Sequence, residues 1–290
     1  MASMSDIKRR RSSIQSTQQI TKAMKLVSTV KLQKAKIRAE SSKPYFRGMY
    51  DTITSLLSKA NSITHPYIVG NDSTEKALIL ISSNRGLAGG YNSNIIKKVV
   101  SEGFDPETTE LYTIGKKGRD GLAHRGFTPV KDYQEMIESP QYADAAKVCS
   151  EITARYMAGE IGEIWLAYTF FKNTVVHEPH LIRLLPVDLD AARDEDGDRD
   201  DDVRAPMNFE QTDENAALEI LVPKYLASML YGAMIQAVAS ENGARMQAMD
   251  SATSNADEMI SKLTLQYNRA RQGSITQEIT EIIGGAEAIN

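Results

Sequence analysis

The chain has 290 residues, of which 25% are charged and 41% hydrophobic, and these values are ordinary for a soluble globular protein. No run approaches the roughly 18 consecutive apolar residues that would span a bilayer, so we expect any membrane role to be peripheral. The single cysteine, Cys149, can neither close an internal disulfide nor build a zinc site.

The net charge of −4 hides an uneven distribution along the sequence. Basic residues are concentrated between Lys8 and Arg47, where Asp6 and Glu40 are the only nearby acids, whereas the run DEDGDRDDD occupies 194–202. This polarity favours an anionic partner for the basic half. The N-terminus is rich in arginine and serine, as mitochondrial transit peptides are, but a helical pattern continues through it and favours a structural role.

The first segment, from Ser5 to about Ala60, is predicted to be one long helix. A helix of ~55 residues would be roughly 80 Å long at 1.5 Å per residue, which is too long to pack on one small core. Pro44 is expected to kink it. Residues at intervals of seven form its predicted seam, and they are Ile7, Ile14, Thr21, Ser28 and Ala35, with Met24 and Val27 beside them.

The central segment has a different period. The predicted strands are 77–81, 110–114, 163–171 and 180–187, and the predicted helices are 93–103, 117–126 and 141–160. This alternation predicts a compact, Rossmann-like α/β domain with a mainly parallel sheet. The acidic stretch that follows, 190–204, is predicted to be a solvated loop.

The last segment, from about Asp213 to Ile283, is again predicted to be a long helix. Pro223 allows a kink or a start, and Gly284 with Gly285 supplies a stop. Its heptad seam consists of Met246, Thr253, Ile260 and Tyr267, interleaved with Met249, Ala256, Leu263 and Ala270. The seam is poor in leucine, so we infer that the two long helices need an additional partner surface.

The predicted fold class is α/β combined with a coiled coil. A long antiparallel coiled coil of the N- and C-terminal helices carries an inserted Rossmann-like α/β domain. The predicted divisions are an N-terminal shaft helix at 1–75, an α/β domain at 76–190, an acidic loop at 191–212 and a C-terminal shaft helix at 213–290.

The glycine-rich sequence SSNRGLAGGYN, at 82–92, follows the first predicted strand, where many nucleotide-binding folds hold a phosphate. A P-loop requires a lysine and a hydroxyl residue after the glycines, but Tyr91 and Asn92 follow Gly90. The dinucleotide pattern G-x-G-x-x-G is also absent. We therefore interpret the sequence as a tight turn that needs glycine torsions.

The remaining motifs favour neither catalysis nor a bound metal. The acidic run fails the register of an EF-hand, because Ala192 and Val203 would occupy its first and last ligand positions. The sequence HEPH at 177–180 lacks a third ligand, and no Ser-His-Asp or Cys-His arrangement emerges. We predict no catalytic residue, no metal site and no cofactor.

The basic N-terminal helix allows two interpretations. A basic coiled-coil protein that binds nucleic acid is the alternative, but no aromatic residue lies between Met1 and Tyr45 to stack on bases. The basic residues also spread around several helix faces, which suits a rod surrounded by protein partners. A stand-alone nucleotide enzyme remains a further rival.

Three stretches resemble the γ subunit of F-type ATP synthase. They are ITKAMKLVSTVKLQKAK (20–36), SSNRGLAGGYN (82–92) and NRARQGSITQEITEIIGGAEAI (268–289), and ENGARMQAMDSATSNADEMI (241–260) also resembles the family's helix. The resemblance covers both ends and the middle of the chain. It departs at Asn84, where aspartate is expected, and at Ala88, where cysteine is common.

The resemblance implies a mechanical transmitter that is not an enzyme by itself. Ion flow would turn the c-ring and the shaft, and the shaft would drive the β sites of an α3β3 hexamer in turn to synthesise or hydrolyse ATP. By similarity, contacts with acidic loops of β are expected at Met24, Lys25, Arg271, Gln272 and Thr276. A foot that meets the c-ring and the ε subunit is expected at Lys224, Tyr225 and Ser228.

The same resemblance implies no nucleic-acid partner and an attachment to the membrane only through the complex. The expected location is the cytoplasmic face of a bacterial plasma membrane, in preference to the matrix side of mitochondria. With Cys149 alone, the chain lacks the cysteine pair of the redox-regulated chloroplast members. Either a proton or a sodium ion is compatible as the coupling ion, because the membrane ring makes that choice.

Overall fold

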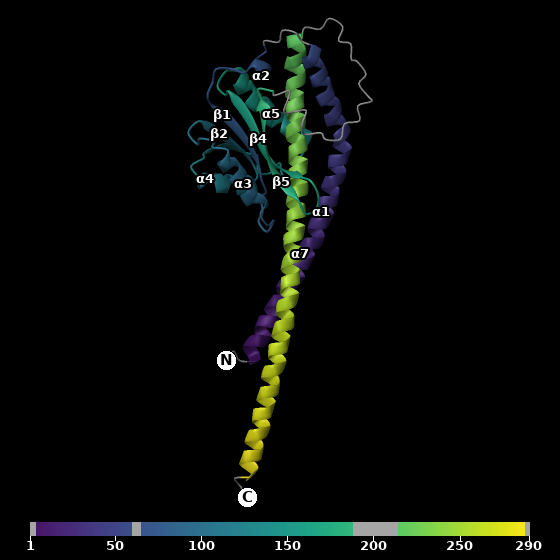
Figure 1. Cartoon of the computed structure of the whole chain (residues 1–290), viewed down its shortest axis with the longest axis vertical. Coiled ribbons are helices and arrows are strands. Elements are labelled where there is room, and N and C mark those ends of the chain that lie inside the picture. The colour runs from purple at the N-terminus through teal and green to yellow at the C-terminus, as the bar shows by residue number, and fades with distance from the viewer. Residues whose placement is uncertain (1–3, 60–64, 188–213, 288–290) are drawn as a thin grey trace. The chain divides into compact units, whose positions relative to one another are not determined.

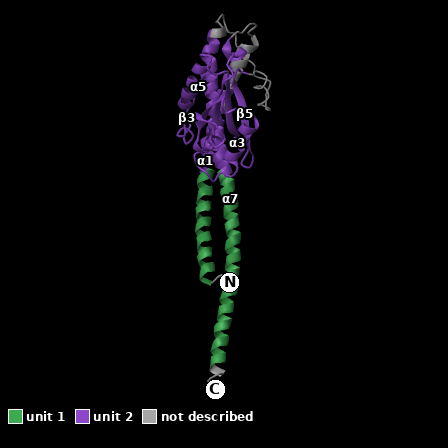
Figure 2. Ribbon diagram, turned by 90° about the vertical axis from the view of Figure 1, so that its left-hand side faces the viewer, with its two compact units in different colours: residues 1–29, 245–290 green, residues 30–244 purple. Residues whose placement is uncertain are grey.

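A computed structural model describes residues 4–59, 65–187 and 214–287 of the chain (Figure 1). The chain forms two compact units, which Figure 2 colours separately. We call residues 1–29 and 245–290 the shaft unit, and residues 30–244 the α/β unit. The acidic stretch at 190–204 lies outside the described residues.

Two long helices contribute to both units. Helix α1 extends over Met4–Lys59 and α7 over Glu214–Glu287, with Pro44 and Pro223 inside them. The predicted stop at Gly284 and Gly285 is wrong, because α7 continues through both glycines. Neither glycine has the positive φ that a glycine helix cap requires, so the helix does not end there.

The α/β unit contains a five-stranded sheet with the order β3-β2-β1-β4-β5. Strands β1 to β4 run parallel, and β5 is antiparallel to β4. The strands are β1 (Lys76–Ile81), β2 (Thr109–Ile114), β3 (Pro129–Asp132), β4 (Glu163–Phe171) and β5 (His177–Leu185). The short helices are α2 (Pro66–Val69), α3 (Tyr91–Ser101), α4 (Lys116–Ala123) and α5 (Tyr142–Met157).

The four predicted strands and the three predicted central helices are therefore confirmed as elements. Strand β3 and helix α2 were not predicted. Strand β3 has four residues, begins with a proline and is mostly exposed, so it shows no hydrophobic alternation. Helix α2 is a single turn, too short for a helical period to register.

Both faces of the sheet are covered, which explains why β1 reads as an unbroken apolar run. Ala77, Ile79 and Ile81 face a core shared with α5 and α7. Leu78 and Leu80 face a second core shared with α3 and α4. Figure 1 shows α3 and α4 beside β1 and β2.

Helix α7 contains a stretch, within Ala216–Gly285, that is long and apolar enough by composition to cross a membrane. The sequence nevertheless has no unbroken apolar run of that length, and 56% of the stretch is buried inside the protein. Leu218, Val222 and Leu230 are fully buried against the sheet side of the core. These are the properties of a helix that completes a protein core.

Candidate functional site

The shaft unit is a two-helix coiled coil whose seam follows the predicted heptads. All eight predicted seam residues of α7, from Met246 to Ala270, are buried or half-buried, while most residues between them are exposed. Only five described side chains of this unit are buried, namely Thr21, Ser28, Met249, Ala256 and Leu263. Two of the five are polar, so little apolar surface holds the pair together.

Polar contacts cross the seam at successive turns. The hydroxyls of Thr21 and Thr253 are 2.8 Å apart, and Lys25 Nζ donates to Asp250 Oδ1 at 2.5 Å. Positions that rise along α1 meet positions that fall along α7, which confirms the antiparallel pairing. The cross-helix contacts are Arg11 over the ring of Tyr267, Gln18 with Asp257, Thr21 with Thr253 and Lys25 with Asp250.

Among the described residues of the shaft unit, no second helix lies beside the C-terminal end of α7 (Figure 2). Between Arg271 and Gly285 every described side chain is exposed except Ser274, which is half-buried. Four of the exposed residues are isoleucines spaced along the helix as i, i+4, i+7 and i+8, which places them on one face. They are Ile275, Ile279, Ile282 and Ile283, and their exposed fractions lie between 45% and 71%.

The residues predicted to contact β fall into two groups along the shaft. Met24 and Lys25 are half-buried, and Lys25 pairs with Asp250 on α7. Arg271, Gln272 and Thr276 are exposed, with the Thr276 hydroxyl donating to the Gln272 carbonyl at 2.9 Å. About 22 residues separate Asp250 from the second group, or roughly 33 Å of helix. The two groups therefore cannot act as one site.

The shaft presents a strongly basic surface on α1. No acidic residue lies between Ile7 and Ala39 in the sequence. The exposed cations of this part of the shaft unit include Lys8, Arg9, Arg10 and Lys22. Such a surface attracts acidic groups on a partner.

The residues predicted to form the foot lie in the α/β unit, and two of the three are buried. Lys224 is exposed, but Tyr225 and Ser228 are only 8% and 2% exposed. The Ser228 hydroxyl donates to the Lys224 carbonyl at 2.7 Å, and Tyr225 belongs to the core beneath the sheet. Of the three, only Lys224 is exposed.

The glycine-rich loop after β1 is hydrogen-bonded to the start of α4 and to the segment after β3. Ser82 Oγ accepts from the Gly118 N–H at 2.8 Å, and Asn84 Oδ1 accepts from the Lys116 N–H at 3.1 Å. The Lys117 N–H donates to the Ser83 carbonyl, so the loop occupies the N–H groups at the start of α4 that could hold a phosphate. Asn84 also donates to the Gln134 carbonyl at 2.7 Å, which an aspartate could not do.

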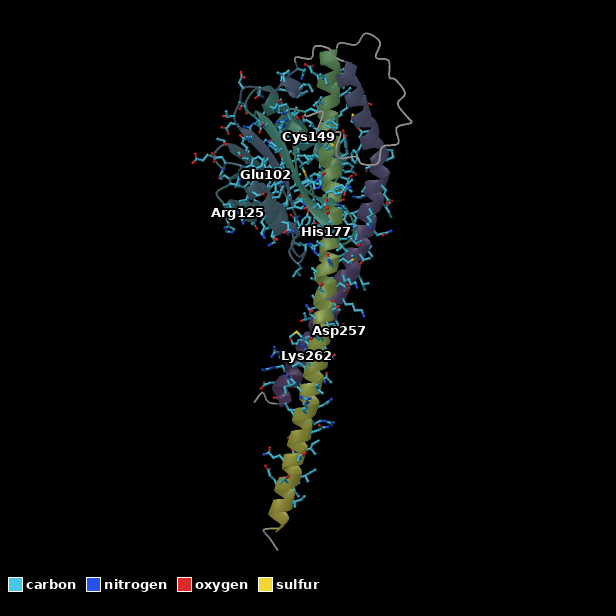
Figure 3. The ribbon with its side chains drawn as sticks, in the orientation of Figure 1. Glu102, Arg125, Cys149, His177, Asp257 and Lys262 are labelled. Atoms are coloured by element: carbon cyan, nitrogen blue, oxygen red, sulfur yellow. The ribbon has the colours of Figure 1, made fainter. Side chains whose placement is uncertain are left out.

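The hairpin of β4 and β5 is hydrogen-bonded to α7 within the α/β unit, an attachment that was not predicted from the sequence. The Phe171 N–H donates to Gln236 Oε1 at 3.3 Å, and the Ser240 hydroxyl donates to the Thr169 carbonyl at 3.0 Å. One turn further, the ring of His177 lies against Gly243, where a Cβ would come within 2.7 Å of it. Figure 3 labels His177 at its position near α7. Burial lowers the pKa of His177 and so favours its neutral form. The isolated glycine in a helical pattern was the available signal.

A group of ionisable residues on β2 and α5 has shifted pKa values without forming an active site. Arg155 donates to Glu110 and, at 2.7 Å, to the Tyr112 hydroxyl, and the hydrogen bond to Glu110 raises the pKa of Arg155. Burial raises the pKa of Tyr112 to about 12. Burial also raises the pKa of Cys149 to about 12, which keeps its thiol protonated and unreactive. These shifts belong to groups paired or buried within the fold.

In the described ranges, no three His, Cys, Asp or Glu residues are placed to hold a metal ion. The molecule combines an antiparallel helical shaft, which has an exposed basic and apolar surface, with an α/β unit whose glycine-rich loop is hydrogen-bonded to α4. A protein of this class offers extended surfaces to partners.

Comparison with known proteins identifies the family. A family model described as ATP synthase matches residues 3–289. The ATP synthase γ chain of Lachnoclostridium phytofermentans is 59% identical over 293 residues, covering all of both chains. A γ chain of Acetobacterium woodii, named as sodium ion specific, is 39% identical, and the match covers 98% of each chain. The chain belongs to the ATP synthase γ chain family.

Solved structures share the fold at low sequence identity. A chain of the Euglena gracilis mitochondrial ATP synthase, from the structure of OSCP, F1 and c-ring in rotational state 3, matches with a TM-score of 0.69 and 16% identity. The match covers 99% of this chain and 94% of that one. A chain of the rotor of the same enzyme, in rotational state 1, matches with a TM-score of 0.65 and 17% identity, covering 94% and 98%. The comparisons give no support to the alternative of a nucleic-acid-binding protein.

Proposed function

We propose that this chain is the central rotor shaft of an F-type ATP synthase. It couples rotation of an ion-driven c-ring to sequential conformational change at the β sites of an α3β3 hexamer, and it is itself non-catalytic. The observation that carries the proposal is the shaft unit of a γ-family chain, in which a thin seam coexists with an extensive exposed surface.

The exposed isoleucines at the end of α7 support this role. A free helix end that exposes Ile275, Ile279 and Ile282 leaves apolar area in water, which costs free energy unless a partner covers it. A surrounding sleeve of subunits supplies that cover without a fixed partner helix. The shaft can then turn within the sleeve.

The basic surface of α1 supplies a second kind of contact. Lys25 and Met24 lie at one level of the shaft and Arg271, Gln272 and Thr276 at another, so acidic loops of β would meet the shaft at two heights. Lys224 would serve the foot that meets the c-ring and ε. Ion pairs between the exposed shaft cations and acidic groups of the partner subunits would be individually weak. They could therefore break and re-form at each step of rotation.

We place the complex on the cytoplasmic face of a bacterial plasma membrane. The relatives that match along their full length at 59% and 39% identity are bacterial γ chains. The chain would be held at the membrane through the c-ring.

The test is reconstitution of the complex. The chain is co-expressed with α and β, the complex is purified through a tag on β, and ATP hydrolysis is measured with the full chain and with a chain that ends at Ala270. We expect the full chain to copurify and stimulate turnover, and the shortened chain to couple poorly. A chain that neither copurifies nor changes turnover would show that the proposal is wrong.

A further inference from the structure

Lys25, beside the coiled-coil seam of the shaft, has a carboxylate from the opposite helix, Asp250, as its partner. It stands at the heptad position that Gln18 occupies one heptad earlier and the buried Leu32 one heptad later. Its ammonium lies 2.5 Å from Asp250 Oδ1, and the two side chains are 39% and 56% exposed. Both charged groups are therefore accessible to solvent, although the Lys25 side chain is partly buried against α7.

Asp250 is the only carboxylate near this ammonium in the sequences of both helices. On α1 no acidic residue occurs from Ile7 to Ala39, and on α7 no other occurs from Arg245 to Asn255. The next carboxylate along α7, Asp257 (Figure 3), accepts a hydrogen bond from the neutral Gln18. Asp250 thus neutralises a single cation within a basic surface.

An exposed ion pair of this kind exchanges partners at low cost. Its strength in water is small, and a second carboxylate brought near can replace the first without burying a charge. An acidic partner group that approaches Lys25 must displace Asp250 and is repelled by it. The carboxylate of Asp250 therefore weakens any partner contact made through Lys25.

We propose that Asp250 is a positioning residue that holds Lys25 against the shaft and limits how tightly an acidic group of the surrounding subunits can bind it. This rests on the proposed rotor function, in which Lys25 meets acidic loops of β. The consequence is a contact strong enough to form at each step and weak enough to release.

The test uses the assembled complex of this chain with α and β. Replacing Asp250→Asn keeps the shape and removes the competing charge, so the partner should hold Lys25 more tightly. We expect turnover of ATP to fall about two- to fivefold at low salt, the range that an exposed ion pair supplies, and to approach the unmodified value at high salt. In a chain that also carries Lys25→Met, Asp250→Asn should have no further effect on turnover.

Asp257→Asn is the matched control, because it removes another α7 carboxylate that accepts a hydrogen bond from α1, in this case from the neutral Gln18. We expect it to leave the salt dependence of turnover unchanged, and melting curves of both variants establish that each is folded. Equal salt dependence in the two variants, or an effect of Asp250→Asn that persists with Lys25→Met, overturns the proposal. If Lys25→Met alone changes neither turnover nor its salt dependence, the predicted contact of Lys25 with β does not form, and that part of the proposed function is wrong instead.

Discussion

The shaft unit and the α/β unit bury different amounts and kinds of side chain. The α/β unit covers both faces of its sheet with fully buried aliphatic residues such as Leu78, Ile79 and Leu230. The shaft unit buries five described side chains, of which Thr21 and Ser28 are polar. The first unit can be stable by its own core, whereas the second leaves much of its surface for partners.

Helix α7 passes through both environments. Between Leu218 and Ala237 it contributes repeatedly to the core of the α/β unit. After Ala270 nearly every described side chain is exposed. The difference shows that a long helix in a rotor can be an ordinary core helix at one end and a contact surface at the other.

Truncating a leucine to alanine should destabilise the protein much more in the α/β unit than in the shaft unit. Leu230 is fully buried in the core, so Leu230→Ala should lower the free energy of unfolding by about 2–5 kcal/mol through lost burial and a residual cavity. Leu265→Ala removes the same atoms from a shaft position that is 53% exposed and should cost less than about 0.5 kcal/mol. Urea unfolding followed by circular dichroism measures both, and equal losses would contradict the comparison.

The attachment of the hairpin to α7 should be sensitive to a single methyl group. In Gly243→Ala the new Cβ would press on the ring of His177 at 2.7 Å, and we expect a net loss of about 1 kcal/mol despite the better helix propensity of alanine. Gly273→Ala adds the same methyl to open space on the same helix and should stabilise by up to about 1 kcal/mol. Thermal melts of the two variants should therefore shift in opposite directions.

The polar seam of the shaft should respond least. Thr253→Val removes the 2.8 Å hydrogen bond to Thr21 and its bond to the Met249 carbonyl, and should cost about 0.5–1 kcal/mol. Thr264→Val removes only a bond to the Ile260 carbonyl within α7, so it isolates the contribution across the seam. Amide hydrogen exchange should show faster opening of shaft amides in Thr253→Val alone, with sheet amides unchanged.

Much of this architecture follows from the sequence, because its periods are long and regular. The seven-residue spacing from Met246 to Tyr267 predicted the seam, and every predicted position on α7 proved buried or half-buried. The apolar run at 77–81 predicted a strand, and β1 forms there with both faces buried. The family and the general role of the terminal helices also followed from sequence stretches.

Other features were decided only by contacts between residues distant in the chain. Lys25 and Asp250 lie 225 positions apart, and no local pattern pairs them. The resemblance predicted partner contacts at Tyr225 and Ser228, but both residues are buried in the α/β unit. A heptad or strand period specifies which face of an element is apolar, whereas the choice of partner for each polar side chain depends on tertiary packing, which brings the two chemical groups within hydrogen-bonding distance.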